Sequence, residues 1–542
     1  MSNEAGEAAA TAAVEPPRTA LPMTTLDAVE LRQLSVLRRV GTTGALLMAV
    51  SSISSYGAAN PVPNPVDGFR IVGLLSRVGP ASLAVSYTGI GLVVVAWFLL
   101  GRLTVPGRVR RLTRTQLSHT LAMWAVPFVL TPPLFSRDVY SYLAVGQMMK
   151  LGFNPYDSGP LDVLGDRDTF AHQVDPKWQH TSTPYGPMFL LIVRVVVAIS
   201  GPHLVTAVLL QRMFELVGIA LMVWALPRLA RRLRLDAISA LWLGALNPLV
   251  LFHLIAGGHN EALMIGMMMA GLVVALDRSL VLGTVLLTMS VGVKATAGLA
   301  LAFLVVELAR RAGGSWRDLL RIGARVGAIF VVSFAVLTVA AGVGVGWLAA
   351  LNTPGLIRSF LSVTTVIGVV TGSIGAILGV GDQTSGVLDV LHPLGTVLGT
   401  LVAGYILWRC WRRRADPILG LGVAIGVFVI LSPVVQPWYL LWAAVPLAAS
   451  TAVARYRKIT VIITLALSVM IMPSGAVIPP FVIAQAVLAA AVIVAIVWIL
   501  LRGRGLIPIS ERDRWLIASA KLARLRHPSA GGRHPPPTRG KP

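Results

Sequence analysis

The stretch that decides the fold is residues 83–101, LAVSYTGIGLVVVAWFLLG, which contains no charged side chain. A helix of about 20 apolar residues is long enough to cross the hydrocarbon core of a bilayer. Lipid offers no hydrogen bonds to the backbone, so such a segment must pair its own polar groups as a helix. Of all 542 residues, 55% are hydrophobic and 13% are charged, against about 25% charged in soluble chains. The sequence therefore predicts an all-α, polytopic transmembrane helical bundle.

Similar apolar blocks recur along the chain, within a predicted transmembrane domain at 40–508. We expect membrane spans at about 40–59, 83–101, 117–135, 204–227, 238–256, 261–276, 280–292, 295–308, 326–350, 386–408, 417–432, 439–453, 459–472 and 480–501. Residues 187–200 are short and contain Arg194, so we expect a re-entrant or interfacial segment there. The Gly-rich stretch 363–381 is a further candidate for dipping into the membrane. The prediction is about 13–15 membrane helices.

Basic residues gather in short clusters between these blocks, within a net charge of +23. The clusters lie at 108–114, 228–234, 310–325, 409–414, 455–458 and 502–504. Clusters of this kind orient membrane helices with the basic side in the cytoplasm, whereas a nucleic-acid site gathers its charge on one face or groove. We therefore expect a multi-pass plasma membrane protein with both termini inside, in contact with lipid and not with nucleic acid.

The two ends of the chain differ from the apolar blocks. Residues 1–24 read as a disordered tail, and 25–39 as an interfacial amphipathic helix in which Asp27 and Glu30 have capping-box spacing. Residues 509–542 read as a basic cytoplasmic tail. The single cysteine, Cys410, excludes internal disulfides and a cysteine-rich metal site. No metal-binding cluster, phosphate-cradling loop or dinucleotide fingerprint is seen, which disfavours a cytosolic nucleotide-sugar donor.

The predicted external loop, residues 136–187, contains six aspartates together with Tyr, Trp, His and Asn residues. Such side chains suit polyhydroxylated ligands, although any external loop is polar. Asp138 stands out because it directly follows a predicted span and would begin a helix lying along the membrane surface. A lipid-linked substrate and a water-soluble acceptor would meet at that boundary. Two structural explanations remain open: a first-turn acid gains about 0.3–1 kcal/mol from the helix dipole, and Arg137 is a potential ion-pair partner.

Three further groups of residues are candidates for function. Gly257-Gly258-His259-Asn260-Glu261 forms a very short turn between spans, and its glycines and asparagine also suit a hairpin. Lys294 and Arg194 lie in apolar stretches, where an ionisable residue marks a functional site by default; each is also able to snorkel. Gln436-Pro437-Trp438-Tyr439 suits either an aromatic membrane anchor or a platform for a sugar or an isoprenoid.

Several motifs in order resemble a known family. They are SRDVYSYLAVGQ at 136–147, GFNPYD at 152–157, TPYGP at 183–187, NPL at 247–249, GGHNEALM at 257–264, SVGVKATA at 290–297 and QPWYLLW at 436–442. Residues 40–500 are similar to the actinobacterial polyprenol-phosphate-mannose-dependent α-1,6-mannopyranosyltransferases of MptA/MptB type, which are GT-C membrane glycosyltransferases. One feature departs from many GT-C enzymes: two apolar blocks, 40–59 and 83–101, precede the span before Asp138.

The resemblance implies a GT-C type bundle that transfers mannose from polyprenyl-phosphate-mannose to a 6-hydroxyl of a lipid-anchored mannan, the lipomannan backbone. The α-1,6 linkage would form with inversion at the external face, and no cofactor would be required. Glu261 matches the acid that helps to bind a divalent metal in some GT-C enzymes, although a metal is not indicated here. Asp138 takes the role of general base. The expected substrate-binding residues are Arg137, Tyr140, Asn154, Tyr156, Tyr185, Arg194, His259, Asn260, Glu261, Lys294, Gln436, Trp438 and Tyr439.

A coherent chemistry accompanies this expectation. A sugar hydroxyl is a weak nucleophile that needs a positioned base, and we expect burial to raise the pKa of Asp138 and make it a better base. Lys294 or Arg194 would stabilise the charge developing on the phosphate. The alternative is a polytopic transporter or a flippase for lipid-linked sugars, although transporters place binding groups near the midplane of repeated halves and no repeat is seen here.

Overall fold

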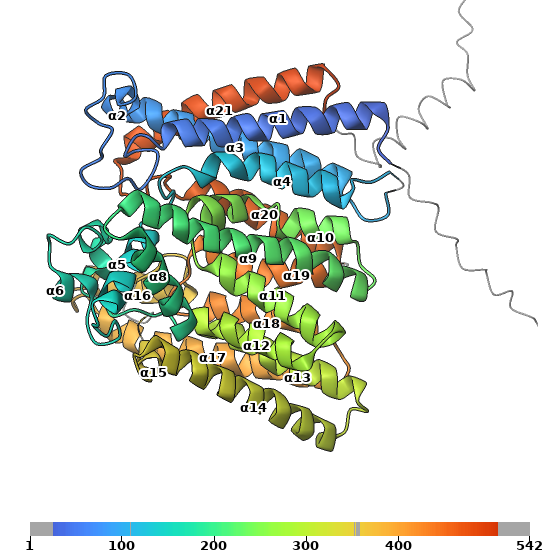
Figure 1. Ribbon diagram of the computed structural model, residues 1–542. Helices are drawn as coiled ribbons and strands as arrows, with labels where there is room; N and C mark the ends of the chain where they lie inside the picture. The colour runs from blue at the N-terminus through green and yellow to red at the C-terminus, as the bar shows by residue number, and fades with distance from the viewer. Residues whose placement is uncertain (1–24, 109, 352, 354–357, 452, 508–542) are drawn as a thin grey trace, which may run out of the picture.

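The computed structural model describes residues 25–507, except 109, 352, 354–357 and 452. All regular elements in that part of the chain are helical, which confirms the predicted all-α class. The predicted tails at 1–24 and 509–542 lie outside the described residues. Figure 1 shows the long helices running roughly side by side, with several short helices gathered at one end.

The elements follow the predicted blocks closely. The first are α1 (Ala28–Ser51), α2 (Leu74–Arg77), α3 (Gly79–Leu100), η1 (Gly101–Leu103) and α4 (Arg114–Val129). The loop region holds α5 (Asp138–Lys150), α6 (Pro160–Leu164), η2 (Ala171–Gln173), α7 (Pro176–Gln179) and α8 (Pro187–Ser200). The centre is built from α9 (Leu204–Arg232), α10 (Ala237–Gly244), the π-helix η3 (Val250–Ala256), α11 (Glu261–Asp277), α12 (Leu280–Val293), η4 (Ala295–Gly298) and α13 (Leu299–Arg311). The last are α14 (Trp316–Ala341), α15 (Trp347–Ala350), α16 (Val363–Ile377), α17 (Thr384–Trp411), α18 (Pro417–Leu431), η6 (Pro437–Tyr439), α19 (Leu440–Ser450), α20 (Ala454–Met470) and α21 (Pro480–Gly503).

Five helices in the described residues are long and apolar enough to cross a membrane: α3 with η1, α9, α14, α17 and α21. A sixth is counted if η3 and α11, which meet at a bend of 108°, form one broken span. The shorter apolar helices α8, α12, α16 and α18 lie at or near predicted blocks. The chain is therefore a polytopic helical membrane protein. The expected total of 13–15 membrane helices stays a prediction, because it also counts shorter helices.

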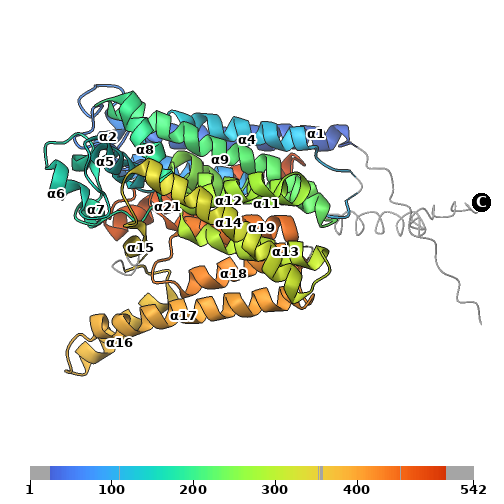
Figure 2. The ribbon, with the colours of Figure 1, turned by 60° about the horizontal axis from the view of Figure 1, so that its bottom comes forward.

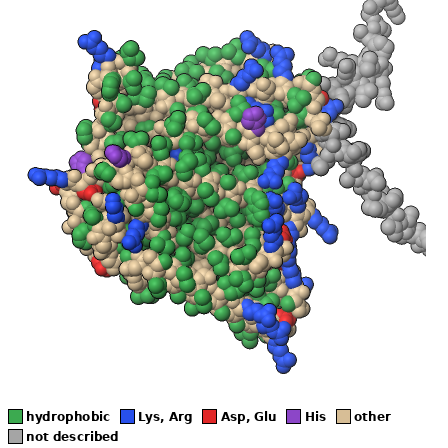
Figure 3. All heavy atoms as spheres, in the orientation of Figure 1, with side chains coloured by type: hydrophobic (Ala, Val, Ile, Leu, Met, Phe, Trp, Pro, Cys, Tyr) green, Lys and Arg blue, Asp and Glu red, His purple; other side chains and the backbone are tan. Residues whose placement is uncertain are grey.

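Arginines of the basic clusters form ion pairs and hydrogen bonds at one end of the bundle, which we call the basic end. Arg108 pairs with Glu30, Arg111 with Asp236, and Arg232 with Asp277. At the same end Arg310 donates to the carbonyl of Ala415, Arg413 to that of Arg310, and Arg457 to that of Gly101. Figure 3 shows Lys and Arg side chains concentrated at one end, beside a broad apolar band. We call the opposite end, which carries α5 to α7, the loop end (Figure 1).

The first helix is longer than the sequence suggests. The predicted capping box forms between Asp27 and Glu30, but α1 then continues to Ser51 without a break near residue 39. The charge of Arg38, near the expected end of the interfacial helix, does not interrupt α1. Its side chain donates to the carbonyl of Gln116 and to the hydroxyl of Thr120 on α4. Helix α1 also packs closely on α3, because a Cβ on Gly44 would lie only 2.6 Å from the carbonyl oxygen of Gly89. Small residues of this kind let membrane helices approach.

Two features shape the outer parts of the bundle. Helix α8 begins beside the end of α12, where the N–H of Gly186 donates to the carbonyl of Val293, and it leads into α9, whose far end carries Arg232 at the basic end. In Figure 2, α16 and α17 form a hairpin beside α18 that extends away from the other helices. Many of its apolar side chains are exposed in the isolated chain, as expected for helices that face lipid.

Candidate active site

Asp138 begins α5 at the loop end, as predicted. Its backbone N–H donates to Oγ of Ser136 at 3.0 Å, and its side chain is 16% exposed. Arg137 points elsewhere: its guanidinium donates to the carbonyls of Gln173 and Asn60 and to the side chain of Gln173. The proposed ion pair between Arg137 and Asp138 therefore does not form, and Arg137 instead fixes the loop beneath the helix.

His259 faces Asp138 across the site. Its Nε2 lies 3.5 Å from Oδ2 of Asp138, and the ring is fully buried. Nδ1 lies 2.8 Å from the carbonyl oxygen of His253, and because a carbonyl only accepts, Nδ1 must carry a hydrogen. Nε2 therefore donates a hydrogen bond to Asp138 only when the ring carries a hydrogen on both nitrogens. The ring of Trp438 lies at 4.0 Å from that of His259, tilted by 30°, and holds it from the other side.

A bend in the chain delivers His259 to this position. The π-helix η3 ends at Ala256 and meets α11 at 108°, and π-helical turns are frequent at functional sites. Gly258 has a φ of +66°, which L side chains rarely adopt. At Gly257 a Cβ would lie 2.6 Å from the carbonyl oxygen of His253. Both glycines are thus required by the bend as well as by the short turn.

Lys294 forms an ion pair with Glu261. The ammonium lies within an aromatic enclosure, 4.7 Å from the ring centre of Tyr439, 5.1 Å from that of Trp442 and 5.8 Å from that of Tyr185. The Glu261 side chain is fully buried, whereas that of Lys294 is 15% exposed. Lys294 is therefore a paired residue of the site, and the snorkelling explanation does not apply.

The electrostatics of Asp138 differ from the sequence-based expectation. Burial does push the pKa of its carboxyl upward, but hydrogen bonding and positive charge from His259, with Lys177 and Ser136, more than offset this and lower the pKa to about 2. The expectation of a raised pKa was wrong because it considered burial without the neighbours. Asp138 is an ionised hydrogen-bond acceptor at any physiological pH.

The other predicted residues are divided by the fold. Trp438, Tyr439 and Tyr185 line the site, as described. Tyr140 donates to the carbonyl of Ala59, Asn154 to the side chain of Asp157, and Tyr156 to the carbonyl of Tyr185. These three hold the loop together, and Tyr156 directly supports Tyr185.

Three predicted residues remain. Arg194 is exposed on α8, and no contact joins it to the site in the described residues. Gln436 is the residue before η6, and its side chain makes no capping hydrogen bond to that helix. Asn260 is fully buried beside His259, and neither of its amide atoms has a hydrogen-bond partner in the described part of the chain. Such a group is available to a ligand.

The sequence interpretation missed several residues that complete the site. Trp442 encloses Lys294, and His253 anchors His259. Below them, Arg212 donates to the carbonyls of Val129, Thr131 and Ala256, and Glu215 accepts from Gln211 and from the backbone of Leu263. Both charged residues lie in the apolar block 204–227, and an ionisable residue within a span is a signal that could have identified them.

The comparisons with known proteins are consistent across most of the chain. A family model described as α-(1→6)-mannopyranosyltransferase, N-terminal domain, matches residues 38–310, and one described as MptB C-terminal domain matches residues 364–499. A probable α-(1→6)-mannopyranosyltransferase of Mycolicibacterium smegmatis is 40% identical over 81% of this chain and 83% of its own length. An α-(1→6)-mannopyranosyltransferase of Mycobacterium tuberculosis is 37% identical over 82% and 83%, and α-(1→6)-mannopyranosyltransferase B of Corynebacterium glutamicum is 33% identical over 84% and 79%. No solved structure matches the chain.

These likenesses, together with the helical bundle and its buried group of acids, histidine and lysine, define the chain as a membrane glycosyltransferase. It belongs to the MptA/MptB family of α-(1→6)-mannopyranosyltransferases.

Proposed function

We propose that this chain transfers mannose from polyprenyl-phosphate-mannose to a 6-hydroxyl of a lipid-anchored α-1,6-mannan, with Asp138 as general base. The names of its relatives support the sugar and the linkage. The observation that carries the proposal is the position of Asp138, at the start of a helix at the loop end, facing His259 and close to the Lys294–Glu261 pair.

The charge distribution supports an external site. The positive-inside rule assigns the basic end to the cytoplasm, and the loop end with Asp138 then faces outward in the plasma membrane. A sugar attached to a membrane-embedded polyprenyl phosphate has its anomeric carbon at the outer membrane surface, near the loop end. The donor requires no nucleotide-binding site, and no phosphate-cradling loop or dinucleotide fingerprint is seen in the sequence.

The proposed reaction is a single displacement. The acceptor O6 attacks the anomeric carbon while the bond from that carbon to the phosphate oxygen breaks and its electron pair leaves with the polyprenyl phosphate. A β-linked donor gives an α-linked product, so one inversion suffices. The transition state has oxocarbenium character, as in glycoside hydrolysis, and the leaving group is stable as an anion without protonation.

The low pKa of Asp138 defines when it acts. A carboxylate with a pKa of about 2 is a weak base toward a free alcohol, but it is always ionised and able to orient the hydroxyl. As the new bond forms, the attacking oxygen becomes strongly acidic, and its proton passes to Asp138 late in the reaction.

Lys294 is the cation closest to the aromatic residues of the site. We propose that the donor phosphate approaches its ammonium, which Glu261 holds in place and the rings of Tyr439 and Trp442 surround. A fixed cation stabilises charge developing on the leaving phosphate without reorganisation. Arg194, which was considered for the same role, is exposed away from these residues and is not assigned it.

The buried charges of α9, Arg212 and Glu215, do not support the alternative that the chain is a transporter. All three backbone acceptors of Arg212 are fixed carbonyls, and Glu215 is bonded to Gln211 and to the backbone of Leu263. These contacts hold the bundle together and do not form a translocation path. Charged groups that serve transport instead face a cavity or a substrate.

The decisive experiment replaces Asp138 with asparagine, which keeps the shape and removes the base. Purified full-length protein in proteoliposomes is supplied with an α-1,6-linked mannooligosaccharide and either radiolabelled polyprenyl-phosphate-mannose or a nucleoside-diphosphate mannose. We expect transfer from the lipid-linked donor alone, and a loss of about 10²–10⁴-fold in D138N. The matched control is D166N, an exposed aspartate of the same loop. Wild-type turnover by D138N, or transfer from the nucleotide donor, would overturn the proposal.

A further inference from the structure

Residues 432–435, which we call the lead segment, have no regular structure. They lie between α18 and η6, and η6 delivers Trp438 and Tyr439 to the site. Among the described residues, no backbone–backbone hydrogen bond involves residues 433–435, although Val434 is buried and its neighbours are partly buried. Buried backbone groups need hydrogen-bond partners, so the conformation of the lead segment depends on side chains.

Hydroxyl groups supply these partners. Ser359 donates through Oγ to the carbonyl of Val435 and accepts from the N–H of the same residue at 3.2 Å. Ser362, the residue that caps α16, donates to the carbonyl of Ser432 at 2.8 Å. Within the lead segment, Ser432 in turn donates to the carbonyl of Val434 at 2.7 Å. Ser359 is 4% exposed and Ser362 is fully buried, so water does not compete for their bonds.

Thr365 completes the set and connects it to α17. Its Oγ1 donates to the carbonyl of Pro433 at 3.0 Å and lies 3.1 Å from Nε2 of His392. Because a carbonyl only accepts, the single hydroxyl hydrogen goes to Pro433, and Nε2 of His392 is the donor to Oγ1. All four carbonyls of the lead segment thus accept from hydroxyl groups, and three of these hydroxyls come from the stretch 359–365.

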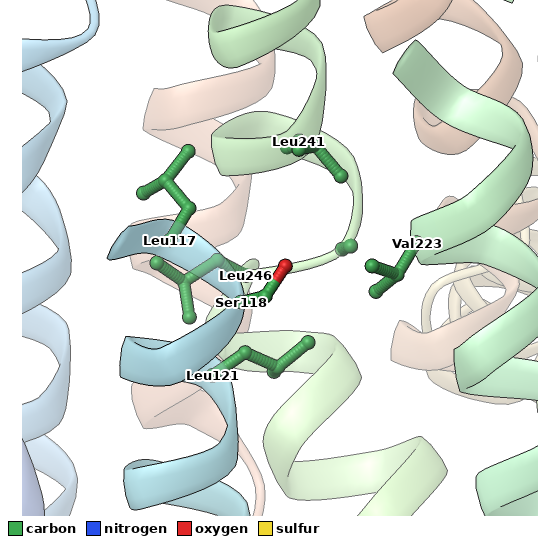
Figure 4. A pocket seen from close by; sticks show the side chains of 7 residues that line it. Leu117, Ser118, Leu121, Val223, Leu241 and Leu246 are labelled. Carbon is green, nitrogen blue, oxygen red and sulfur yellow. The ribbon is translucent and has the colours of Figure 1, made fainter. Parts of the chain in front are cut away.

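Contacts between other helices of the bundle are made differently. Figure 4 shows leucine and valine side chains around a hollow between α4, α9 and α10. Ser118 is the one polar residue in its lining, which includes Leu117, Leu121 and Val223. Side chains of this kind pack helices without fixing a particular backbone group. The hydroxyls of the stretch 359–365 are different, since each bonds one defined carbonyl.

The lead segment is close to the reacting groups along the chain. Trp438 follows it by three residues, and its ring centre lies 4.0 Å from that of His259. The ring centre of Tyr439 lies 4.7 Å from the ammonium of Lys294. A shift of the lead segment would therefore displace the neighbours of both residues, and a misplacement of about 1 Å can lower a rate by about 10²-fold. The hairpin of α16 and α17 extends away from the other helices (Figure 2), yet its hydroxyls bond this segment.

We propose that Ser359, Ser362 and Thr365 are positioning residues of the active site. They hold the lead segment so that Trp438 and Tyr439 stay packed against His259 and Lys294. They act through the backbone and not on the sugar itself. Their effect on the rate rests on the proposed function of the site, but the holding of the lead segment is measurable without turnover.

The first test is hydrogen–deuterium exchange in the detergent-solubilised full-length protein, read by mass spectrometry on peptides covering 433–442. T365V removes the hydroxyl and keeps the shape of the side chain, and T365S keeps a hydroxyl. The matched control is T371V, because Thr371 of the same helix bonds the carbonyl of Ile367 within α16. We expect T365V to raise the exchange rate of these amides at least threefold, since exchange reports local opening. T365S should restore most of the protection, and T371V should exchange as wild type does.

The second test is mannose transfer in a double-mutant cycle. The loss of one hydrogen bond in T365V is expected to lower kcat by about three- to tenfold, with KM for the acceptor nearly unchanged and kcat largely recovered in T365S. If Thr365 acts through Trp438, T365V should have little further effect on kcat in a W438A background. A threonine with a structural role alone would lower kcat by the same factor in both backgrounds.

S359A repeats both tests at the other end of the lead segment, where it removes both bonds to Val435. Wild-type exchange in T365V and S359A, or equal loss of kcat with and without W438A, would overturn the inference. If D138N keeps its turnover, or the lipid-linked donor transfers no mannose, the proposed function fails. The exchange measurement then still decides whether these hydroxyls hold the lead segment.

Discussion

His259 turns Nε2 toward Oδ2 of Asp138 at 3.5 Å while its Nδ1 donates to the carbonyl of His253. The carbonyl fixes which nitrogen carries the hydrogen, so the nitrogen facing Asp138 gains a proton only when the ring becomes cationic. The hydrogen bond and positive charge that lower the pKa of Asp138 therefore come from the cationic form of this ring. This arrangement makes the acid–base behaviour of the site a property of two residues.

Replacing His259 by phenylalanine should shift the acid limb of the pH–rate profile upward. In wild type the pKa of Asp138 is lowered to about 2, so the ionised carboxylate is fully present at neutral pH and is lost only as the pH falls through that value. In H259F, burial still raises the pKa of Asp138, while the hydrogen bond and charge of His259 are gone. We expect kcat/KM of H259F to decline at a higher pH than that of wild type.

Rates measured between pH 4 and 8 check this prediction. W438F serves as the control, since it perturbs the ring packed on His259 but keeps the imidazole. Superimposable acid limbs for wild type and H259F would show that His259 does not set the protonation of Asp138.

The Lys294–Glu261 pair makes a second prediction, which separates stability from activity. Glu261 is fully buried, so K294M leaves a buried carboxylate without its ion-pair partner, at a cost of about 3–5 kcal/mol. The double variant K294M/E261Q removes both charges and should recover most of that stability. We expect it to stay inactive, because the cation proposed to stabilise the phosphate is absent.

Thermal unfolding in detergent and mannose transfer are the two measurements for this pair. The control is R311M, which breaks an ion pair with Glu307 of α13 whose arginine side chain is 40% exposed and should lower stability by less than about 1 kcal/mol. Activity in the double variant would remove Lys294 from the mechanism while leaving its structural role.

Mannose transfer should continue after chelation of divalent metals. No three His, Cys, Asp or Glu residues group together as metal ligands within the described part of the chain, and a phosphate-linked donor leaves as a stable anion. Purified enzyme treated with EDTA is expected to keep its turnover. A loss that added Mg²⁺ or Mn²⁺ restores would show that the acids of the site hold a metal during the reaction.

The sequence predicted the position of the site better than its contacts. Asp138 and the turn at His259 could be identified because unusual polar residues border apolar blocks, and both lie where expected. The pairing of Lys294 with Glu261 could not be predicted, since it joins separate helices whose packing no local pattern specifies. Trp442 was missed because, in an apolar block, it is indistinguishable from a lipid-facing or core residue.

One predicted membrane span also shows what local sequence patterns leave undetermined. The predicted span at 238–256 is divided in the structure into α10 and the π-helix η3. The motif Asn247-Pro248 lies at the break, where Asn247 donates to Thr464 and to the carbonyl of Leu243. Apolar composition predicted one membrane span here, but it carries no information on where polar side chains bond the backbone and break the helix.

Arg212 provides the last prediction, because it ties together the two segments that deliver the catalytic pair. Its guanidinium donates to the carbonyls of Val129 and Thr131, which precede Asp138, and to that of Ala256, which precedes His259.

R212M removes these charged hydrogen bonds, each worth about 1.5–3 kcal/mol. The free energy of unfolding should therefore fall, and kcat should fall with it. R212K keeps the charge and at least one donor and should recover part of both. R228M is the matched control, since among the described residues Arg228 of the same helix bonds the carbonyl of Trp224 and stacks on its ring. We expect the contact between Asp138 and His259 to weaken in R212M. The acid limb of its pH–rate profile should then move to higher pH, toward that of H259F. An R212M protein that unfolds earlier but keeps the wild-type pH profile would show that Arg212 stabilises the bundle without positioning the pair.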